Sequence, residues 1–217
     1  MSCNASWSGD LVFGSDDDII IVAVPDDSLA EILGKINCSG KSIVAHTSGS
    51  TGMDVFPSHI KHAGVFYPLQ TFSPGRNIEF RNLPFFIEAS DSTSSGKLKD
   101  LAGLIGGRVH FIDSERRRML HVAAVFVCNF TNHMFTAGKQ ITEKAEIPFE
   151  VLKPLIHETV MKALESGPEN SQTGPAYRSD TKTLKKHIDL LSFSPELQGI
   201  YRDVTESIMN LYKNHSL

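Results

Sequence analysis

The stretch "DIIIVAVPDDSLAEILGKI", residues 18–36, decides the fold. Its first part is a continuous aliphatic and β-branched run, typical of a strand buried on both faces of a parallel sheet. Leu29, Ile32 and Leu33 then recur at helical spacing, and Asp26 or Asp27 can cap that helix. A buried strand followed at once by a short helix indicates an α/β fold.

The same alternation continues to about residue 113. The sequence predicts strands over residues 41–47, 64–72, 83–90 and 108–113, with Pro68 breaking the second of these, and a helix over 94–107. We therefore expect an incomplete Rossmann-type α/β sheet in residues 1–113.

The second half of the chain shows no strand pattern. From Ser114 to the end, helices are predicted over residues 114–145, 148–166, 179–191 and 194–213, so residues 114–217 form an all-helical domain. Pro154 is expected to strain the second helix. Residues 119–130 are apolar on nearly every side, which predicts that this part of the first helix is buried all round.

The composition excludes several classes of function. The 217 residues carry a net charge of -4, which gives no electrostatic case for nucleic-acid binding. No apolar run is long enough to cross a membrane, and the N-terminus is not a signal peptide. The three cysteines have neither metal-ligand nor redox spacing. We expect no metal site and a cytoplasmic location, where scattered thiols stay reduced.

The motif "HTSGSTG", residues 46–52, follows the second predicted strand. It lacks the Gly-Lys-Ser/Thr of a P-loop, and the basic continuation of the acyl-adenylate-forming enzymes is also absent. Ligands of open α/β sheets bind outside the carboxyl ends of strands. The sequence therefore predicts a ligand crevice at two neighbouring strand ends, formed by Pro25 and Asp26 at the first and by His46, Thr47, Ser48 and Ser50 at the second. A capped turn without a ligand is an equal alternative.

Polar side chains on the long helix are the candidates for chemistry. His121 is titratable near neutral pH and can donate or accept a proton, and Asn129 and Asn132 lie further along the same helix. The alternative is that His121 and Asn129 are satisfied core groups or dimer contacts. The arginines of "ERRR", residues 115–118, are interpreted as a solvated face.

Two further side chains are candidate substrate ligands. Gln70 can reach the crevice, although the segment around it is more typical of structural lining. Arg178 can clamp a carboxylate or phosphate; alternatively, Asp180 caps the next helix and Arg178 pairs with a neighbouring acid.

Six blocks in order resemble a known bacterial family: "DIIIVAVPDDSLAEIL", "AHTSGS", "GVFYPLQTFS", "LPFFIEAS", "HVAAVFVCNF" and "TGPAYRSD". The family is the Rossmann-like oxidoreductases with a C-terminal helical domain of unknown function, labelled NADP-dependent or deazaflavin-dependent. It looks distantly related to pyrroline-5-carboxylate reductase and to the 6-phosphogluconate and β-hydroxyacid dehydrogenases.

The resemblance implies a division of roles. Val24, Pro25, Asp26, His46, Thr47 and Ser48 would bind NADP or NAD, and Ser50, Gln70, Asn132 and Arg178 would contact a small substrate. A helix at the place of "HVAAVFVCNF" supplies a Lys and an Asn in the related dehydrogenases; His121 would stand in for the Lys here, with Asn129 orienting the substrate. The helical domain would form a homodimer.

One family element has no counterpart in this sequence. The Gly-x-Gly-x-x-Gly loop, which presents backbone donors to the pyrophosphate, is absent, and about sixty residues of the family pattern would precede the first strand. The chain thus resembles a truncated member. Two functions follow as hypotheses: a nicotinamide-dependent reductase acting on a small carbonyl or imine, or a non-catalytic dimeric binding or scaffold protein that has lost cofactor binding.

Overall fold

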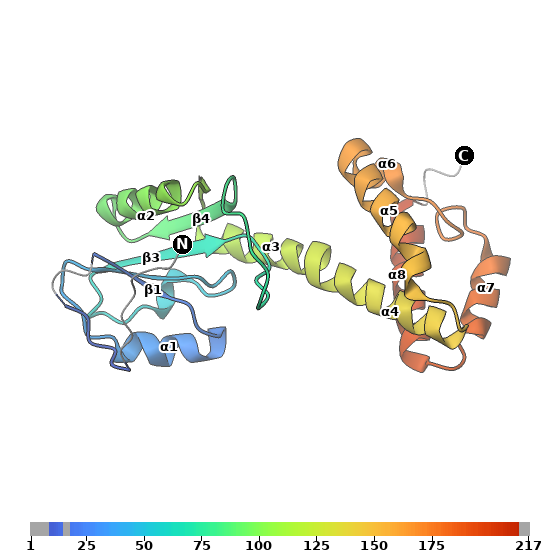
Figure 1. Cartoon of the computed structure of the whole chain (residues 1–217), viewed down its shortest axis with the longest axis horizontal. Coiled ribbons are helices and arrows are strands. Elements are labelled where there is room, and N and C mark those ends of the chain that lie inside the picture. Colours follow the sequence, from blue (N-terminus) through green and yellow to red (C-terminus); the bar gives the residue numbers. More distant parts are fainter. Residues whose placement is uncertain (1–8, 15–17, 213–217) are drawn as a thin grey trace. The chain divides into compact units, whose positions relative to one another are not determined.

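The computed structural model describes residues 9–14 and 18–212, and the chain divides into two compact units at Thr131 (Figure 1). The first unit is built on one sheet, and the second contains helices. Each unit is described by itself.

The first unit holds a five-stranded sheet in the order β1-β2-β3-β4-β5. The strands are β1 (Ile19–Val22), β2 (Ile43–His46), β3 (His62–Pro68), β4 (Pro84–Ala89) and β5 (Arg108–Phe111). The first three are parallel; β4 runs antiparallel to β3, and β5 is parallel to β4. Val22 pairs with His46 and His46 with Val65, so the carboxyl ends of β1, β2 and β3 meet at one edge.

Two helices cover the two faces of this sheet (Figure 1). Helix α1 (Asp26–Lys35) packs Leu29 and Leu33 against Val44, whereas α2 (Ser92–Leu104) packs Leu98 and Ala102 on the opposite face. Side chains alternate across a strand, so neighbouring residues of β2 enter different cores. The predicted side-chain cap of α1 is wrong: Pro25 occupies the N-cap position, and both aspartates lie in the first turn, where their charge still favours the helix N-terminus.

The predicted long helix is present but not buried. It consists of α3 (Ser114–Ala124), a π-helical segment (Val125–Phe130) and α4 (Thr131–Lys144) in succession. Met119, Phe126 and Val127 are 67%, 63% and 75% exposed, so the prediction of burial on all sides is wrong for the single chain. Apolar residues around a helix predict burial, but a partner outside the chain can provide it.

The second unit continues α4 with α5 (Lys153–Ser166), the short α6 (Pro168–Ser171), α7 (Thr181–Leu190) and α8 (Pro195–Tyr212). Asp180 accepts a hydrogen bond from the backbone of Thr183 at 3.1 Å and caps α7, as predicted. Pro154 lies in the first turn of α5, where a proline fits without strain, so the expected strain is wrong. None of the described helices has the length and apolarity that crossing a membrane requires.

Candidate active site

The loop after β2 is a tight turn organised by Ser48. The Ser48 hydroxyl accepts hydrogen bonds from the backbone N–H groups of Ser50 at 3.2 Å and Thr51 at 2.9 Å. The Ser50 hydroxyl donates to the carboxylate of Asp26 at the start of α1. The structure therefore contains the capped turn, and it also joins the ends of β1 and β2, as the crevice hypothesis requires.

His46 lies beneath this turn and is fully buried. Its Nδ1 accepts a hydrogen bond from the Ser48 N–H at 3.2 Å, and its ring stacks on Phe56 with the centroids 5.4 Å apart. The pKa of His46 is lowered to about 4. Burial is the larger cause, and the positive charge of Arg117 is the second. The ring is therefore neutral at physiological pH. In the structure it stabilises the backbone of the turn by accepting the Ser48 N–H.

The other predicted residues at the two strand ends differ in exposure. Val24 is half-buried and packs against the core beneath α1, whereas Pro25 and Asp26 are exposed. Thr47 is half-buried, and its N–H donates to the Val22 carbonyl at 3.3 Å. Asp26 and Ser50 are thus the side chains that this edge of the sheet offers to solvent.

The geometry brings His121 of α3 to the same edge. His121 Nδ1 lies 3.2 Å from the Tyr67 hydroxyl near the end of β3. Gly49 packs against both rings: a Cβ there would stand 2.5 Å from His121 Nδ1 and 2.9 Å from Tyr67 Cζ. A side chain at this position would displace the pair, so the glycine of "HTSGS" is required by close approach.

A cavity of about 630 Å³ opens beside this pair within the first unit. It is bounded by the segment after β3, by α3 and by the π-helical segment, a type of distortion frequent at functional sites. Its lining is Tyr67, Leu69, Gln70, Thr71, Phe72, Leu120, His121, Ala123, Ala124, Val125, Val127, Cys128 and Asn129. The structure thus gathers three of the predicted site residues, His121, Asn129 and Gln70, around one cavity.

Arg117 is the central residue that the sequence interpretation missed. Its side chain is completely buried, and Nη1 forms an ion pair with Glu88 of β4 at 2.6 Å. Its Nε donates to the Ser48 carbonyl at 3.3 Å, and Nη2 donates to the Thr51 carbonyl. Ser114 completes the network, because its hydroxyl donates to Glu88 at 2.7 Å.

This network corrects the interpretation of "ERRR" as a solvated face. Arg116 and Arg118 have side-chain exposures of 78% and 50%, but Arg117 points into the unit and fastens α3 to the turn. Arg117 and His121 are four residues apart and so share one helix face. The guanidinium that holds the turn therefore also fixes the face that presents His121 to Gly49.

The remaining predicted residues belong to the second unit. Asn132 is exposed on α4, and Arg178 is exposed in the segment between α6 and α7, where its charge favours the ionised form of Asp180. Their contact with a substrate stays a prediction. Among the described residues, no group of three or more metal-ligating side chains converges on one point.

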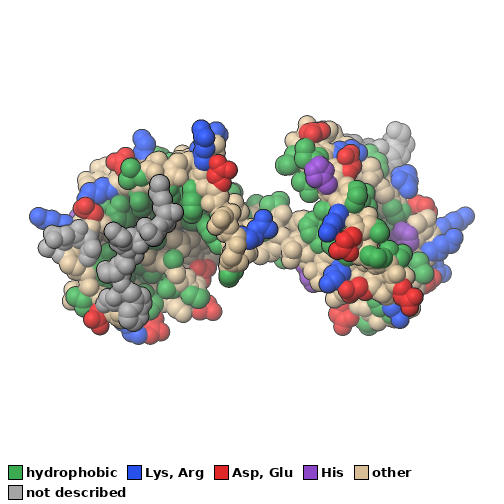
Figure 2. Space-filling view, viewed as in Figure 1, with side chains coloured by type: hydrophobic (Ala, Val, Ile, Leu, Met, Phe, Trp, Pro, Cys, Tyr) green, Lys and Arg blue, Asp and Glu red, His purple; other side chains and the backbone are tan. Residues whose placement is uncertain are grey.

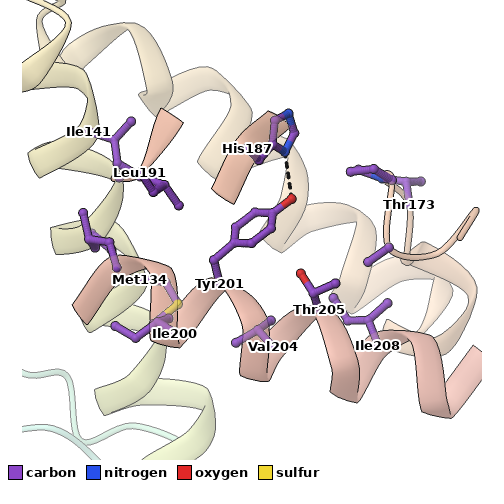
Figure 3. Close-up of a pocket in the computed structure, with 15 residues that line it drawn as sticks. Met134, Ile141, Thr173, His187, Leu191, Ile200, Tyr201, Val204, Thr205 and Ile208 are labelled. Atoms are coloured by element: carbon purple, nitrogen blue, oxygen red, sulfur yellow. Dashed lines mark hydrogen bonds between the residues drawn. The ribbon is translucent and has the colours of Figure 1, made fainter. Parts of the chain in front are cut away.

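The helical unit has a cavity of its own, of about 460 Å³ between α4, α7 and α8 (Figure 3). Its wall is almost wholly apolar, with residues such as Met134, Ile141 and Ile208. Thr173, Thr205 and one polar pair interrupt the wall. In the pair, His187 Nδ1 and the Tyr201 hydroxyl lie 2.7 Å apart. The dashed line in Figure 3 marks this contact.

Residues 83–208, more than half of the chain, match a family model described as a domain of unknown function, DUF2520. The chain belongs to this family. A protein of Bacteroides fragilis described as a "putative NADP oxidoreductase" is 40% identical, with a TM-score of 0.85 over 94% of this chain and 80% of its own. This match confirms the resemblance and the Rossmann-type architecture with a helical C-terminal region.

Two more distant structures share the fold. A protein of Thermotoga maritima is 20% identical over 92% of this chain and 80% of its own, with a TM-score of 0.71. The imine reductase of Myxococcus stipitatus, in complex with NADP+, is 14% identical over 90% of this chain and 76% of its own, with a TM-score of 0.52. No curated protein matches the chain.

Proposed function

We propose that the chain carries the catalytic site of a nicotinamide-dependent oxidoreductase that reduces a small carbonyl or imine substrate. The observation that carries this proposal is the His121–Tyr67 pair, placed at the carboxyl edge of the sheet and beside a cavity. The description of the Bacteroides fragilis relative as an NADP oxidoreductase supports the same chemistry.

The side chains at this edge suit one end of a nicotinamide cofactor. Asp26 is an exposed carboxylate in contact with the Ser50 hydroxyl, and such groups hydrogen-bond ribose hydroxyls. These residues would hold the ribose beside the nicotinamide. The chain offers no glycine-rich loop for the pyrophosphate, so the fit is limited to that end. The chemistry that a reduced nicotinamide bound there would contribute is the hydride for the carbonyl or imine carbon.

His121 and Tyr67 would supply the proton. Burial raises the pKa of Tyr67, so its phenol stays protonated and would donate the hydrogen bond to Nδ1 of His121 in this mechanism. The imidazole proton then resides on Nε2 and would pass to the substrate oxygen or nitrogen as the new C–H bond forms. The Tyr67 hydroxyl proton would move to Nδ1 in the same step, and solvent would later return a proton to the tyrosinate. Tyr67 fixes the tautomer and the ring orientation. The carboxamide of Asn129 can orient the substrate by a hydrogen bond.

The experiment is a reductase assay that follows oxidation of millimolar NADPH and reduced nicotinamide mononucleotide with a panel of carbonyl and imine compounds. We expect the His121→Ala variant to lose at least about a hundredfold in turnover. Tyr67→Phe should lose less and shift the pH profile. His157→Ala, an exposed histidine of α5, is the matched control. Equal turnover by the His121→Ala and wild-type proteins would contradict the proposal.

We also propose that the helical unit forms a two-fold homodimer. Helix α5 contains no buried residue, and its Leu155 and Leu164 are 63% and 78% exposed. Figure 2 shows many apolar side chains on the visible surface of this unit. A unit of this size cannot bury such faces by itself, and exposed apolar patches mark protein interfaces.

The apolar cavity between α4, α7 and α8 supports the same assembly, because helix side chains of a second copy could fill it. Light scattering should give twice the chain mass at micromolar concentration. Leu155→Glu with Leu164→Glu should give monomers that remain helical by circular dichroism, whereas Lys153→Glu, an exposed control at the start of α5, should remain dimeric. A wild-type monomer would refute the dimer.

A further inference from the structure

The cavity beside His121 has a lining without permanent charge. Of the described side chains that form it, none is a lysine, arginine, aspartate or glutamate. Its polar groups are the hydroxyls of Tyr67 and Thr71, the carboxamides of Gln70 and Asn129, and the imidazole of His121. The thiol of Cys128 also lines the cavity, and the rest of the lining is apolar.

The charged groups nearest along α3 are already engaged. The guanidinium of Arg117 is buried against Glu88 and two backbone carbonyls. Arg118 donates to the Ser50 carbonyl at 3.1 Å and lies 3.6 Å from Asp54. Neither arginine lines the cavity, so neither can pair directly with a molecule bound there.

The cavity is open to solvent on one side, because Gln70, Val127 and Asn129 of its lining are exposed. A carboxylate or an iminium that leaves water to lie against the apolar part of the wall meets no opposite charge there, so its loss of hydration is not offset. A neutral carbonyl needs only hydrogen bonds, which His121 and Asn129 can donate, and its apolar substituents match the aliphatic wall. The volume of about 630 Å³ lies in the range of small-molecule sites.

We infer that the substrate of this site is an uncharged aldehyde or ketone with apolar substituents, rather than an oxo acid or a protonated imine. The inference rests on the proposed reductase function and narrows its substrate class. It follows from the neutral donors of the cavity and from the absence of charged side chains among its described lining residues.

The test measures binding to the complete chain without turnover. Three probes of one shape are titrated into protein labelled at histidine and tyrosine: acetophenone, its para-carboxylate and its para-aminomethyl derivative. We expect acetophenone to shift the His121 and Tyr67 resonances and to bind at least about tenfold more tightly than either charged probe, a difference of about 1.4 kcal/mol.

A charge placed at the rim should reverse this preference. Gln70 is exposed and lines the cavity, so Gln70→Arg should tighten binding of the carboxylate probe by about tenfold. Gln140→Arg adds the same charge on an exposed position of α4, outside the cavity lining, and should leave the order of the three probes unchanged.

Three outcomes would overturn the inference: a charged probe that binds wild type as tightly as acetophenone, an unchanged order in Gln70→Arg, or no acetophenone shift up to its solubility limit. These outcomes are independent of catalysis. An inactive protein that binds acetophenone selectively refutes the reductase but keeps the neutral site, whereas an active protein that prefers the carboxylate refutes only the substrate class.

Discussion

Replacing Arg117 by methionine should unfold the first unit more easily and loosen its turn. The substitution removes the guanidinium that pairs with Glu88 at 2.6 Å and holds the Ser48 and Thr51 carbonyls. Breaking a buried ion pair by removing one partner costs about 3–5 kcal/mol. Glu88 remains 19% exposed and keeps the Ser114 hydroxyl as a donor, so we expect a loss near the lower end, about 3 kcal/mol.

The double variant Arg117→Met with Glu88→Leu separates charge from positioning. It leaves no unpaired charge, and apolar replacements of buried pairs are often neutral for stability. Two backbone carbonyls still lose their donor, so we expect about 1–2 kcal/mol of destabilisation rather than about 3. Amide exchange of residues 48–53 should be faster in both variants, because in both the arginine no longer holds the turn.

Urea unfolding monitored by circular dichroism measures these free energies, and hydrogen exchange assigns the transition to the strands of the first unit. Arg116→Met is the matched control, because that side chain is 78% exposed and should change stability by less than about 0.5 kcal/mol. The reasoning is refuted if Arg117→Met behaves like the control, or if the double variant is less stable than Arg117→Met alone.

Three further predictions concern the turn and the crevice. Burial lowers the pKa of His46 to about 4, so as the pH falls this histidine takes up a proton in the unfolded chain before it does so in the folded protein. The contribution of His46 to the free energy of unfolding is therefore complete above pH 6.5 and is lost as the pH drops toward 4. Between pH 8 and 5 wild type should lose about 2 kcal/mol more than His46→Gln in urea titrations. Gly49→Ala should displace the His121 and Tyr67 resonances, whereas Gly52→Ala, whose added Cβ meets the ends of the exposed Arg118 and Asp54 side chains, should not. Calorimetry on residues 1–217 should show that NADPH binds no more tightly than reduced nicotinamide mononucleotide, because the sequence has no glycine loop for the pyrophosphate. We expect the dissociation constant of NADPH to be much weaker than low micromolar, and a low-micromolar value would contradict this.

Much of the fold was predictable because its signals are local. The runs of β-branched residues in β1 and β2 and the capping residue Asp180 lie where the sequence predicts them. The direction of β4 was not predictable, since an aliphatic and aromatic strand has the same composition whichever way it runs. Burial of the long helix within the chain was predicted wrongly. A helix with apolar residues on nearly every side indicates that it must be buried, but the sequence does not say whether the chain itself or a partner buries it.

The candidate site was predictable only in part, because its contacts join distant residues. His121 was chosen for its chemistry, but its partner Tyr67, 54 residues earlier, lies in the segment around Gln70 that was interpreted as structural lining. Arg117 was missed because three consecutive arginines at a helix start are typical of a solvated surface. Its burial depends on Glu88, 29 residues away on another strand, and no local pattern contains that pairing.

The turn after β2 shows why a structural and a functional interpretation of one motif need not compete. Ser48 uses its hydroxyl to satisfy the N–H groups of Ser50 and Thr51, as an ordinary capped turn does. The same hydrogen bonds, together with the one that Arg117 donates to the Ser48 carbonyl, fix the backbone so that Gly49 packs against the His121–Tyr67 pair. The proposed catalytic pair must keep its geometry to act, and the turn would supply the rigidity that this requires. Loosening the turn should therefore lower turnover, which the Gly49→Ala and Arg117→Met variants test from its two sides.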